Sequence, residues 1–243
     1  MIEKLPFKVD INAMRDALHI IKQMPITMQA KEFGYNNFGG WSVLSREGTC
    51  EDGWQVGEEN CEGKEYNWTL AKYLNLSHAF EHANKTPACI GEIDRIITLL
   101  EENGFYPRRA RVTVLKANSS SIVHADAPSD VYMCRIHIPL ITNPKCIHWT
   151  ENGESHMPAD GSVYMLPVNV LHQIRNDSNE DRYHLIMDAY DTRKFTRTMR
   201  YTGSMKSIEY LARLHREGID NAKLTIVHKL IYYIGKQIYK WRT

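Results

Sequence analysis

The sequence lacks an excess of charge of either sign. Its 243 residues include 30 Lys and Arg against 29 Asp and Glu, a formal net charge of +1. Proteins that bind nucleic acid or acidic membranes through bulk electrostatic attraction carry a clear basic excess. The β-rich part of the chain also has no basic stripe with interleaved aromatic residues. We therefore expect no nucleic-acid partner.

Long apolar runs and paired cysteines are also missing. No stretch approaches the roughly 18–20 apolar residues that a membrane-spanning helix needs, and the N-terminal residues MIEKLPFKVD lack the apolar core of a signal peptide. The five cysteines are widely spread and include no Cys-x-x-Cys, which is typical of reduced thiols rather than of a disulfide scaffold. These absences predict a cytoplasmic protein without a transmembrane segment.

The chain has no glycine-rich phosphate loop, which argues against a nucleotide-binding fold. A chain of this length buries roughly 70–75% of its unfolded surface, so one domain with elaborations fits. We expect a single domain over residues 1–200. Its β core should lie at about 108–191, preceded by helices and a loop in 1–107, and a helical extension should follow at 201–243.

Two N-terminal segments have helical periodicity. The first runs from an N-cap at Asp10 through apolar residues at helical spacing and stops at Pro25. The second is expected to begin at Thr86, which would act as its N-cap before a proline, and to end before Gly104. Both should pack an apolar face on the rest of the domain.

The segment between these helices contains two other features. Residues 36–66 read as a turn, a strand and then a long loop, which is either a loop of the kind that often carries binding residues or a solvated insertion. Trp41 is an expected substrate contact. His78 and His82 stand at i and i+4, a spacing that can share a metal on a helix. No third ligand is recognisable near them, so surface or structural histidines are the preferred interpretation.

From about residue 108 the pattern changes to extended structure. Several short alternating runs separated by turn residues are typical of an antiparallel barrel or sandwich. We therefore predict an α+β chain with a mainly β core. The expected strands cover residues 111–117, 131–141, 146–149, 162–166, 168–175 and 183–190.

The strongest chemical pattern is His124-Ala-Asp126, followed by His172. Side chains at i and i+2 of an extended strand lie on one side, so His124 and Asp126 share a face that the imidazole of His172 can complete. Two imidazoles and a carboxylate with the other positions open are the ligand set of non-haem Fe(II) oxygenases. The same set suits catalytic zinc, or manganese, in a hydrolase.

Other histidines compete with His172 for the third position. His148 and His156 lie in a segment that reads as a loop-rich hairpin. His184 lies just past a turn and is the reserve ligand. We prefer His172.

Arg182 follows His172 by ten residues. If residues 176–178 form the tip of a hairpin, Arg182 lies directly opposite His172 and shares its face. A buried arginine there could bind the distal carboxylate of a co-substrate. The alternative is a surface arginine beside an acidic turn.

Two other expected strands carry polar side chains. Arg135 and His137 share the face opposite the apolar residues of their strand, and this face meets solvent unless the barrel interior is the site. Thr113 could donate to a carboxylate, although an ordinary strand threonine explains it equally well.

Residues 108–191 resemble the aspartyl/asparaginyl β-hydroxylase family of Fe(II)- and 2-oxoglutarate-dependent oxygenases. The matching positions are Thr113, His124, the R-I-H-I-P-L block at 135–140, the turn at Gly161, His172 and Arg182. The resemblance implies a double-stranded β-helix, jelly-roll or cupin-like, with flanking N- and C-terminal helices. It implies iron ligands at His124 and His172 and 2-oxoglutarate contacts from Thr113, Arg135, His137 and Arg182.

One position departs from the best-known animal member of the family, which has glycine where this chain has Asp126. The chain is therefore more similar to bacterial and phage-type members that keep the full triad, including free-proline hydroxylases. This similarity argues against transferring the animal enzyme's substrate, a side chain in a folded extracellular module.

We expect a dioxygenase that uses Fe(II), 2-oxoglutarate and O2 and releases succinate and CO2. Its substrate would be an unactivated C–H of an amino acid, peptide or protein side chain of Asp, Asn or Pro type. Arg135 would contact this substrate if the co-substrate does not occupy it. The alternative is a non-catalytic cupin-like protein that binds a metal or small ligand.

The basic apolar stretch at 224–241 predicts a C-terminal helix. Such a helix could lie on a membrane surface. Packing on its own domain, or a homodimer contact through the C-terminal helices, is the preferred interpretation.

Overall fold

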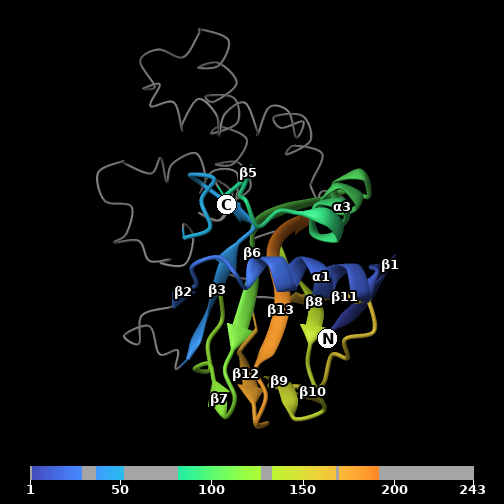
Figure 1. The fold of residues 1–243 in the computed structure, drawn as a ribbon. Coiled ribbons are helices and arrows are strands. Elements are labelled where there is room, and N and C mark those ends of the chain that lie inside the picture. The colour runs from blue at the N-terminus through green and yellow to red at the C-terminus, as the bar shows by residue number, and fades with distance from the viewer. Residues whose placement is uncertain (1, 29–36, 52–81, 127–132, 168–169, 192–243) are drawn as a thin grey trace, which may run out of the picture.

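The computed structural model describes residues 2–28, 37–51, 82–126, 133–167 and 170–191 (Figure 1). The predicted C-terminal extension and His78 lie outside the described residues. In chain order the elements are β1 (Glu3–Lys8), α1 (Ile11–Ile21), β2 (Thr27–Met28), β3 (Phe38–Ser42), β4 (Leu44–Ser45), β5 (Asn84–Lys85), α3 (Gly91–Glu102), β6 (Phe105–Leu115), β7 (Ser119–Ser120), β8 (Met133–Ile141), β9 (Cys146–Thr150), β10 (Gly153–Ser155), β11 (Ser162–Pro167), β12 (His172–Asn176) and β13 (Arg182–Asp191).

The strands of the described residues form two main antiparallel sheets. The larger has seven strands in the order β1-β11-β8-β13-β6-β3-β2, and the smaller has four in the order β10-β9-β12-β7. A short pair, β4 and β5, stands apart from both. The fold is thus mainly β with two helices in the described part of the chain, as predicted, and it has a cupin-like arrangement.

Helices α1 and α3 cover one face of the larger sheet, and α1 crosses in front of it in Figure 1. Asp10 caps α1, because its Oδ1 accepts hydrogen bonds from the backbone N–H groups of Asn12 and Ala13 at 2.9 and 3.1 Å. Its backbone N–H donates to Glu92 Oε1 on α3 at 2.8 Å, which ties the two helix starts together. The predicted start of α1 is confirmed, and the helix ends at Ile21, before the predicted stop at Pro25.

The apolar sides of the helices and the sheet share one core. Period-two alternation in the central strands places every second residue in this layer. Its members include Met14, Leu18 and Ile21 of α1, Ile93, Ile97 and Leu100 of α3, Val112 and Val114 of β6, Ile136 and Ile138 of β8, and Leu185 and Met187 of β13.

Helix α3 begins at Gly91, so the prediction of a start at Thr86 is wrong. The Thr86 hydroxyl accepts from the Ala88 N–H at 3.1 Å and donates to the Ser42 carbonyl of β3. Its carbonyl accepts from the Cys89 N–H at 3.0 Å. Thr86 therefore closes a turn that precedes the helix, a motif that resembles an N-cap in sequence because the same hydroxyl bonding serves both.

The opposite face of the larger sheet is polar and buried. Arg111 and Thr113 of β6, His137 of β8, and His184 and Asp188 of β13 are all buried. The smaller sheet faces this layer, since the ring centroids of His137 on β8 and His148 on β9 are 6.5 Å apart. A polar interior between two sheets is where a ligand site is expected in this type of fold.

The predicted hairpin between His172 and Arg182 is wrong. Strand β12 pairs with β9 and β7 in the smaller sheet, whereas β13 pairs with β6 and β8 in the larger one. Arg182 stands opposite Leu115 of β6. The turn after Asn176 carries the chain from one sheet to the other, so His172 and Arg182 reach the interior from different walls.

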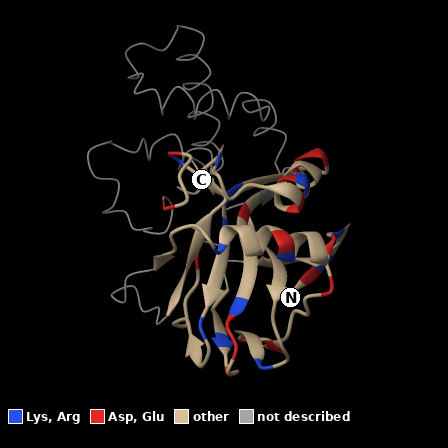
Figure 2. Cartoon of the chain, viewed as in Figure 1, with Lys and Arg blue, Asp and Glu red and all other residues tan. Residues whose placement is uncertain are grey.

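Charges of both signs are distributed over the helices and the strand ends (Figure 2). Blue segments also occur within the strands, in keeping with the buried arginines of β6 and β13. Within the described residues, no helix has the length and apolarity needed to cross a membrane.

Candidate metal centre

His124 and His172 form an isolated antiparallel bridge at the edge of the smaller sheet. Each backbone N–H donates to the other residue's carbonyl, at 3.1 Å from His124 and 2.9 Å from His172. Directly paired residues project to the same face, and the two ring centroids are 4.6 Å apart. The backbone pairing alone therefore brings together two imidazoles that are far apart in sequence.

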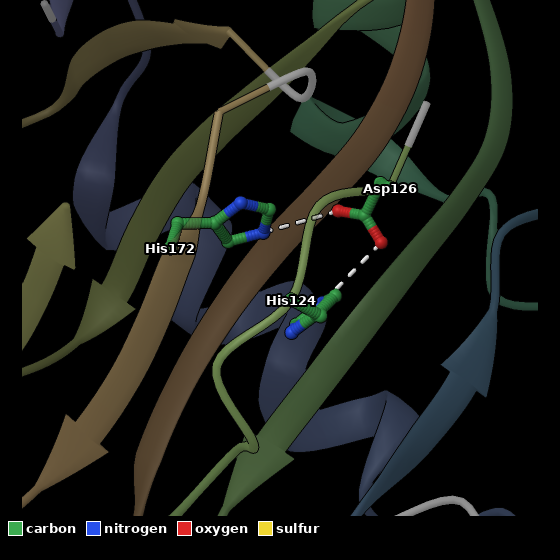
Figure 3. Close-up of side chains that lie close together, drawn as sticks. All are labelled: His124, Asp126 and His172. Atoms are coloured by element: carbon green, nitrogen blue, oxygen red, sulfur yellow. Dashed lines mark ion pairs between the residues drawn. The ribbon is translucent and has the colours of Figure 1, made fainter. Parts of the chain in front are cut away.

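Asp126 places its carboxylate between the two rings (Figure 3). Oδ1 lies 3.3 Å from His124 Nε2, and Oδ2 lies 3.1 Å from His172 Nε2. Among the described residues, these three form the one group of His, Cys, Asp or Glu whose ligand atoms all lie within 4.8 Å of one another. The competing histidines at 148, 156 and 184 are not part of it.

The same local device orients both rings. Nδ1 of His124 is 2.9 Å from the Ile122 carbonyl, and Nδ1 of His172 is 2.9 Å from the Val170 carbonyl. A carbonyl only accepts, so each Nδ1 carries a proton, and when the ring is neutral its Nε2 holds the lone pair that a metal ion would take. Metal-bound histidines are oriented in this way.

The electrostatics favour an ionised carboxylate. Burial alone would raise the pKa of Asp126, but the Arg135 guanidinium, and the hydrogen bonds that both Nε2 atoms donate while they carry protons, outweigh it and hold this pKa far below its usual range. The hydrogen bond to Asp126 raises the pKa of His124. Two Nε2 lone pairs and an ionised carboxylate fit a divalent iron ion.

A column of rings, buried except for His124, runs from this triad into the interior. We call it the histidine column: His124, His172, His148, His137 and His184. Successive ring centroids are 4.6, 5.8, 6.5 and 5.7 Å apart. Arg182 ends the column, with Nη2 2.8 Å from Nδ1 of His184. The metal centre and the predicted carboxylate-binding arginine are thus two ends of one interior.

The remaining predicted contacts have different surroundings. Arg135 contacts Asp126 and places Nη2 2.9 Å from Asp188 Oδ1. The Thr113 hydroxyl is buried and donates to the His184 carbonyl at 3.1 Å. Both therefore lie on the interior face, and in this structure both are bonded to protein groups.

Trp41 lies on the wrong face for a substrate contact. It pairs with Val112 of β6 and belongs to the core beneath the helices, with 3% of its surface exposed. Its Nε1–H donates to the Met24 carbonyl at 3.1 Å. The prediction from loop texture is wrong because Trp41 belongs to a paired strand whose alternation directs it away from the site.

Sequence reasoning missed Asp188, which lies at the centre of a buried charge network. Arg109 places Nε and Nη2 each 2.7 Å from Asp188 Oδ2 on one side, and Arg135 binds Oδ1 on the other. Asp188 follows Arg182 by six residues, so period-two alternation from Arg182 would have placed it on the same inner face.

The fold and the triad define a class, a cupin-like barrel with a candidate His/Asp/His metal centre in its interior. The family model for aspartyl/asparaginyl beta-hydroxylase matches residues 47–192, more than half of the 243-residue chain. The chain belongs to this family, whose members are 2-oxoglutarate-dependent hydroxylases.

Several solved structures match this chain at low sequence identity. An oxidoreductase of the 2OG-Fe(II) oxygenase family from Burkholderia pseudomallei is 14% identical, with a TM-score of 0.45 over 78% of this chain and 85% of that one. A prolyl-4-hydroxylase from Pseudomonas putida is 11% identical, with a TM-score of 0.42 over 78% and 91%. HygX from Streptomyces hygroscopicus, solved with nickel, 2-oxoglutarate and hygromycin B, is 9% identical, with a TM-score of 0.47 over 80% and 84%.

Proposed function

We propose that the protein is an Fe(II)- and 2-oxoglutarate-dependent dioxygenase in which His124, Asp126 and His172 hold the iron. The observation that carries the proposal is the histidine column, because it joins a divalent-metal site to a buried arginine within one polar interior. A 2-oxo acid would chelate the metal ion at the triad, and its distal carboxylate would bind Arg182 at the other end of the column.

Bound iron would supply the oxidation chemistry: O2 and 2-oxoglutarate would be consumed, succinate and CO2 released, and one oxygen atom inserted into a substrate C–H. The protein's part is to hold the donors in place. The Nδ1 bonds fix the two rings, and Arg135, braced by Asp188, fixes the orientation of Asp126. This bracing favours an orienting role for Arg135 over a direct substrate contact.

Arg182 is the proposed partner of the distal carboxylate. It is 2% exposed, and its Nη1 has no hydrogen-bond partner among the described residues. Burial lowers its pKa to about 10, so it stays protonated at neutral pH. A buried, unsatisfied guanidinium N–H is costly, and a carboxylate would satisfy it.

His137 is the proposed contact nearer the metal. It is fully buried, and its Nδ1 has no partner among the described residues. Burial, and then the positive charge of Arg182, hold its pKa well below the usual range, so the ring is neutral. A neutral imidazole can offer a hydrogen bond to an anion without adding charge to an already cationic interior.

The substrate side is proposed from the family alone: an amino acid, peptide or protein side chain of Asp, Asn or Pro type. The apolar side chains of Ile122, Val123 and Leu171 are exposed next to the iron ligands and would meet the aliphatic part of such a substrate.

A cytoplasmic location is proposed from the four cysteines in the described residues, all of which are free thiols. The 1–200 domain and the 201–243 extension also stay predictions.

The decisive experiment is an anaerobic titration of metal-free protein with Fe(II) and then 2-oxoglutarate. A 2-oxo acid chelated to Fe(II) gives a weak visible charge-transfer band. We expect this band only after both additions, and succinate formation once O2 and a suitable substrate are supplied. His172→Ala should lose both signals, whereas His19→Ala, on the exposed side of α1, should keep them.

Other outcomes separate the alternatives. Iron binding without the band would indicate the non-catalytic cupin-like protein. Binding of zinc in preference to iron, with hydrolysis of a test ester, would indicate a hydrolase. Undiminished succinate formation by His172→Ala would contradict the assignment of the ligands.

A further inference from the structure

We infer that Arg109 is a positioning residue of the metal centre. It holds Asp188, which in turn holds Arg135, and Arg135 binds the metal ligand Asp126. The inference rests on the proposed function, because it takes the triad to bind a divalent ion, and it deepens that proposal. The family resemblance gives Arg109 no role. The argument comes from the bonding of these four side chains and from the backbone at Arg109.

Asp188 is shared by two guanidinium groups, one on each carboxylate oxygen. Arg109 places Nε and Nη2 each 2.7 Å from Oδ2. Arg135 places Nε 3.0 Å and Nη2 2.9 Å from Oδ1. Each arginine therefore binds one oxygen with the same edge of its planar fork. Because both oxygens are occupied, the carboxylate cannot turn without breaking its contacts to one of the arginines.

The third nitrogen of the Arg135 guanidinium reaches the metal centre. This nitrogen, Nη1, donates to Asp126 Oδ2, the oxygen that also lies 3.1 Å from His172 Nε2. Since Asp188 binds both Nε and Nη2, the guanidinium plane is fixed and Nη1 has a defined position. The orientation of the Asp126 carboxylate, and with it the oxygen offered to a metal ion, depends on that position.

The backbone at Arg109 is irregular in a way that serves this contact. Along β13 the step from Ile186 to Asp188 covers two residues. The partners of these residues on β6, Arg111 and Arg108, are three apart, so β6 carries a β-bulge here. Arg109 lies in the bulge with a φ of +43°, a left-handed conformation that is unfavourable for a residue with a Cβ. Bulges redirect side chains, and strained backbone of this kind is concentrated at functional sites.

Burial makes each bond of this network hard to replace. The side chains of Asp188 and Arg109 are 0% and 9% exposed, and that of Arg135 is 12% exposed, so water has little access to a group that loses its partner. Without Arg109, Oδ2 of Asp188 would compete with Asp126 for the donors of Arg135. We therefore expect loss of Arg109 to loosen the contact that orients Asp126.

The test measures Mn(II) binding to the full chain by calorimetry, without 2-oxoglutarate and without turnover. Arg109→Met removes the guanidinium and should weaken Mn(II) binding by about 10–100-fold, as loss of an outer contact to a metal ligand does. Arg109→Lys keeps the charge and a donor but lacks the planar fork, so it should recover part of the affinity. This variant also keeps the buried charges balanced and supplies the measurement if Arg109→Met does not fold.

A double variant distinguishes positioning from a general loss of stability. Arg135→Met removes the contact to Asp126 directly and should weaken Mn(II) binding at least as much as Arg109→Met. Adding Arg109→Lys to Arg135→Met should change the affinity by less than about twofold, because both residues act through one path. Leu5→Ala is the control, since Leu5 is buried in the apolar core on the edge strand β1. It should lower the melting temperature and leave Mn(II) binding unchanged.

The inference is overturned if the Arg109 variants that fold bind Mn(II) as tightly as the wild type, or if Leu5→Ala loses as much affinity as they do. Additive losses in the double variant would also overturn it, because Arg109 would then not act through Arg135. In each case binding of Mn(II) and 2-oxoglutarate by the wild type would leave the proposed function standing. Failure of the wild type to bind Mn(II) would instead reject the proposed function itself.

Discussion

At the scale of single residues, the buried carboxylate of Asp188 should make the free energy of unfolding depend on pH in the acid range. Burial alone would raise its pKa, but Arg109, Arg135 and Arg111 outweigh burial and hold the pKa at about 2. An ordinary Asp titrates near 3.8, so the unfolded chain binds a proton here before the folded chain does. This site contributes stability above pH 3.8 that is lost as the pH falls toward 2, on the order of 2 kcal/mol in total.

Asp188→Asn should therefore destabilise the protein by about 3–5 kcal/mol at pH 7, because it removes the buried carboxylate that pairs with both Arg109 and Arg135. The difference from the wild type should shrink as the pH falls below 4. Urea unfolding followed by circular dichroism at several pH values measures the loss of stability at pH 7 and its change with pH. Asp16→Asn, on the exposed side of α1, is the control, and a difference that does not change with pH would contradict the assignment.

At the scale of elements, Gly161 lets β1 and β11 meet. Its φ is +80°, and a Cβ added there would lie 2.5 Å from the Val9 carbonyl oxygen, while the Val9 N–H donates to the Gly161 carbonyl at 3.0 Å. Gly161→Ala thus combines left-handed strain with a clash against backbone. We expect a loss of about 3 kcal/mol or more in the free energy of unfolding.

Gly91→Ala is the matched comparison, because Gly91 also has a positive φ, +53°, but a Cβ there would meet nothing within 4 Å. Backbone strain alone should lower the free energy of unfolding of the Gly91→Ala variant by about 1 kcal/mol. Chemical denaturation of both variants separates the two effects. Equal losses of stability in the two variants would show that β1 moves aside and that the close contact between Gly161 and Val9 does not contribute to the loss.

Element by element, the sequence was most informative where structure is local. The Asp10 cap, the helix that ends at Ile21 and the alternation of β6, β8 and β13 all depend on neighbours within a few residues. The sheet to which β12 belongs depends on partners far along the chain, and ten residues between His172 and Arg182 fit a hairpin as well as a crossing between sheets. Trp41 was misplaced for the same reason, since its orientation is set by pairing with Val112.

The sequence pattern predicted that His124, Asp126 and His172 lie together, and they do, although His124 pairs with His172 as an isolated bridge and not within a strand. The bracing of Asp126 by Arg135 and Asp188 was not predictable, because it needs two strands in register. In β8 and β13, Arg135 stands opposite Asp188. That register is set by the whole sheet.

At the scale of the whole molecule, metal binding should be coupled to folding. His124 and Asp126 come from the segment after β7, and His172 begins β12, so an ion held by all three would join chain segments nearly 50 residues apart. A ligand that binds only the folded state stabilises it by about 2.7 kcal/mol when its concentration is 100 times its Kd.

We therefore expect Fe(II) or Mn(II) under anaerobic conditions to raise the melting temperature of the wild type. Asp126→Ala should lose most of this rise, while Asp16→Ala should keep it. Differential scanning calorimetry with and without metal measures the change. An equal rise in the Asp126 variant would mean that the ion binds elsewhere.

The order of the larger sheet has a consequence for how the protein is made. Strand β13 lies between β6 and β8, yet it is the last of the three to leave the ribosome. While β6 and β8 are being synthesised, the strand that joins them does not exist, and both present open edges. Folding of the core must wait for Asp191, and until then the nascent chain is the form of this protein that most needs protection by chaperones.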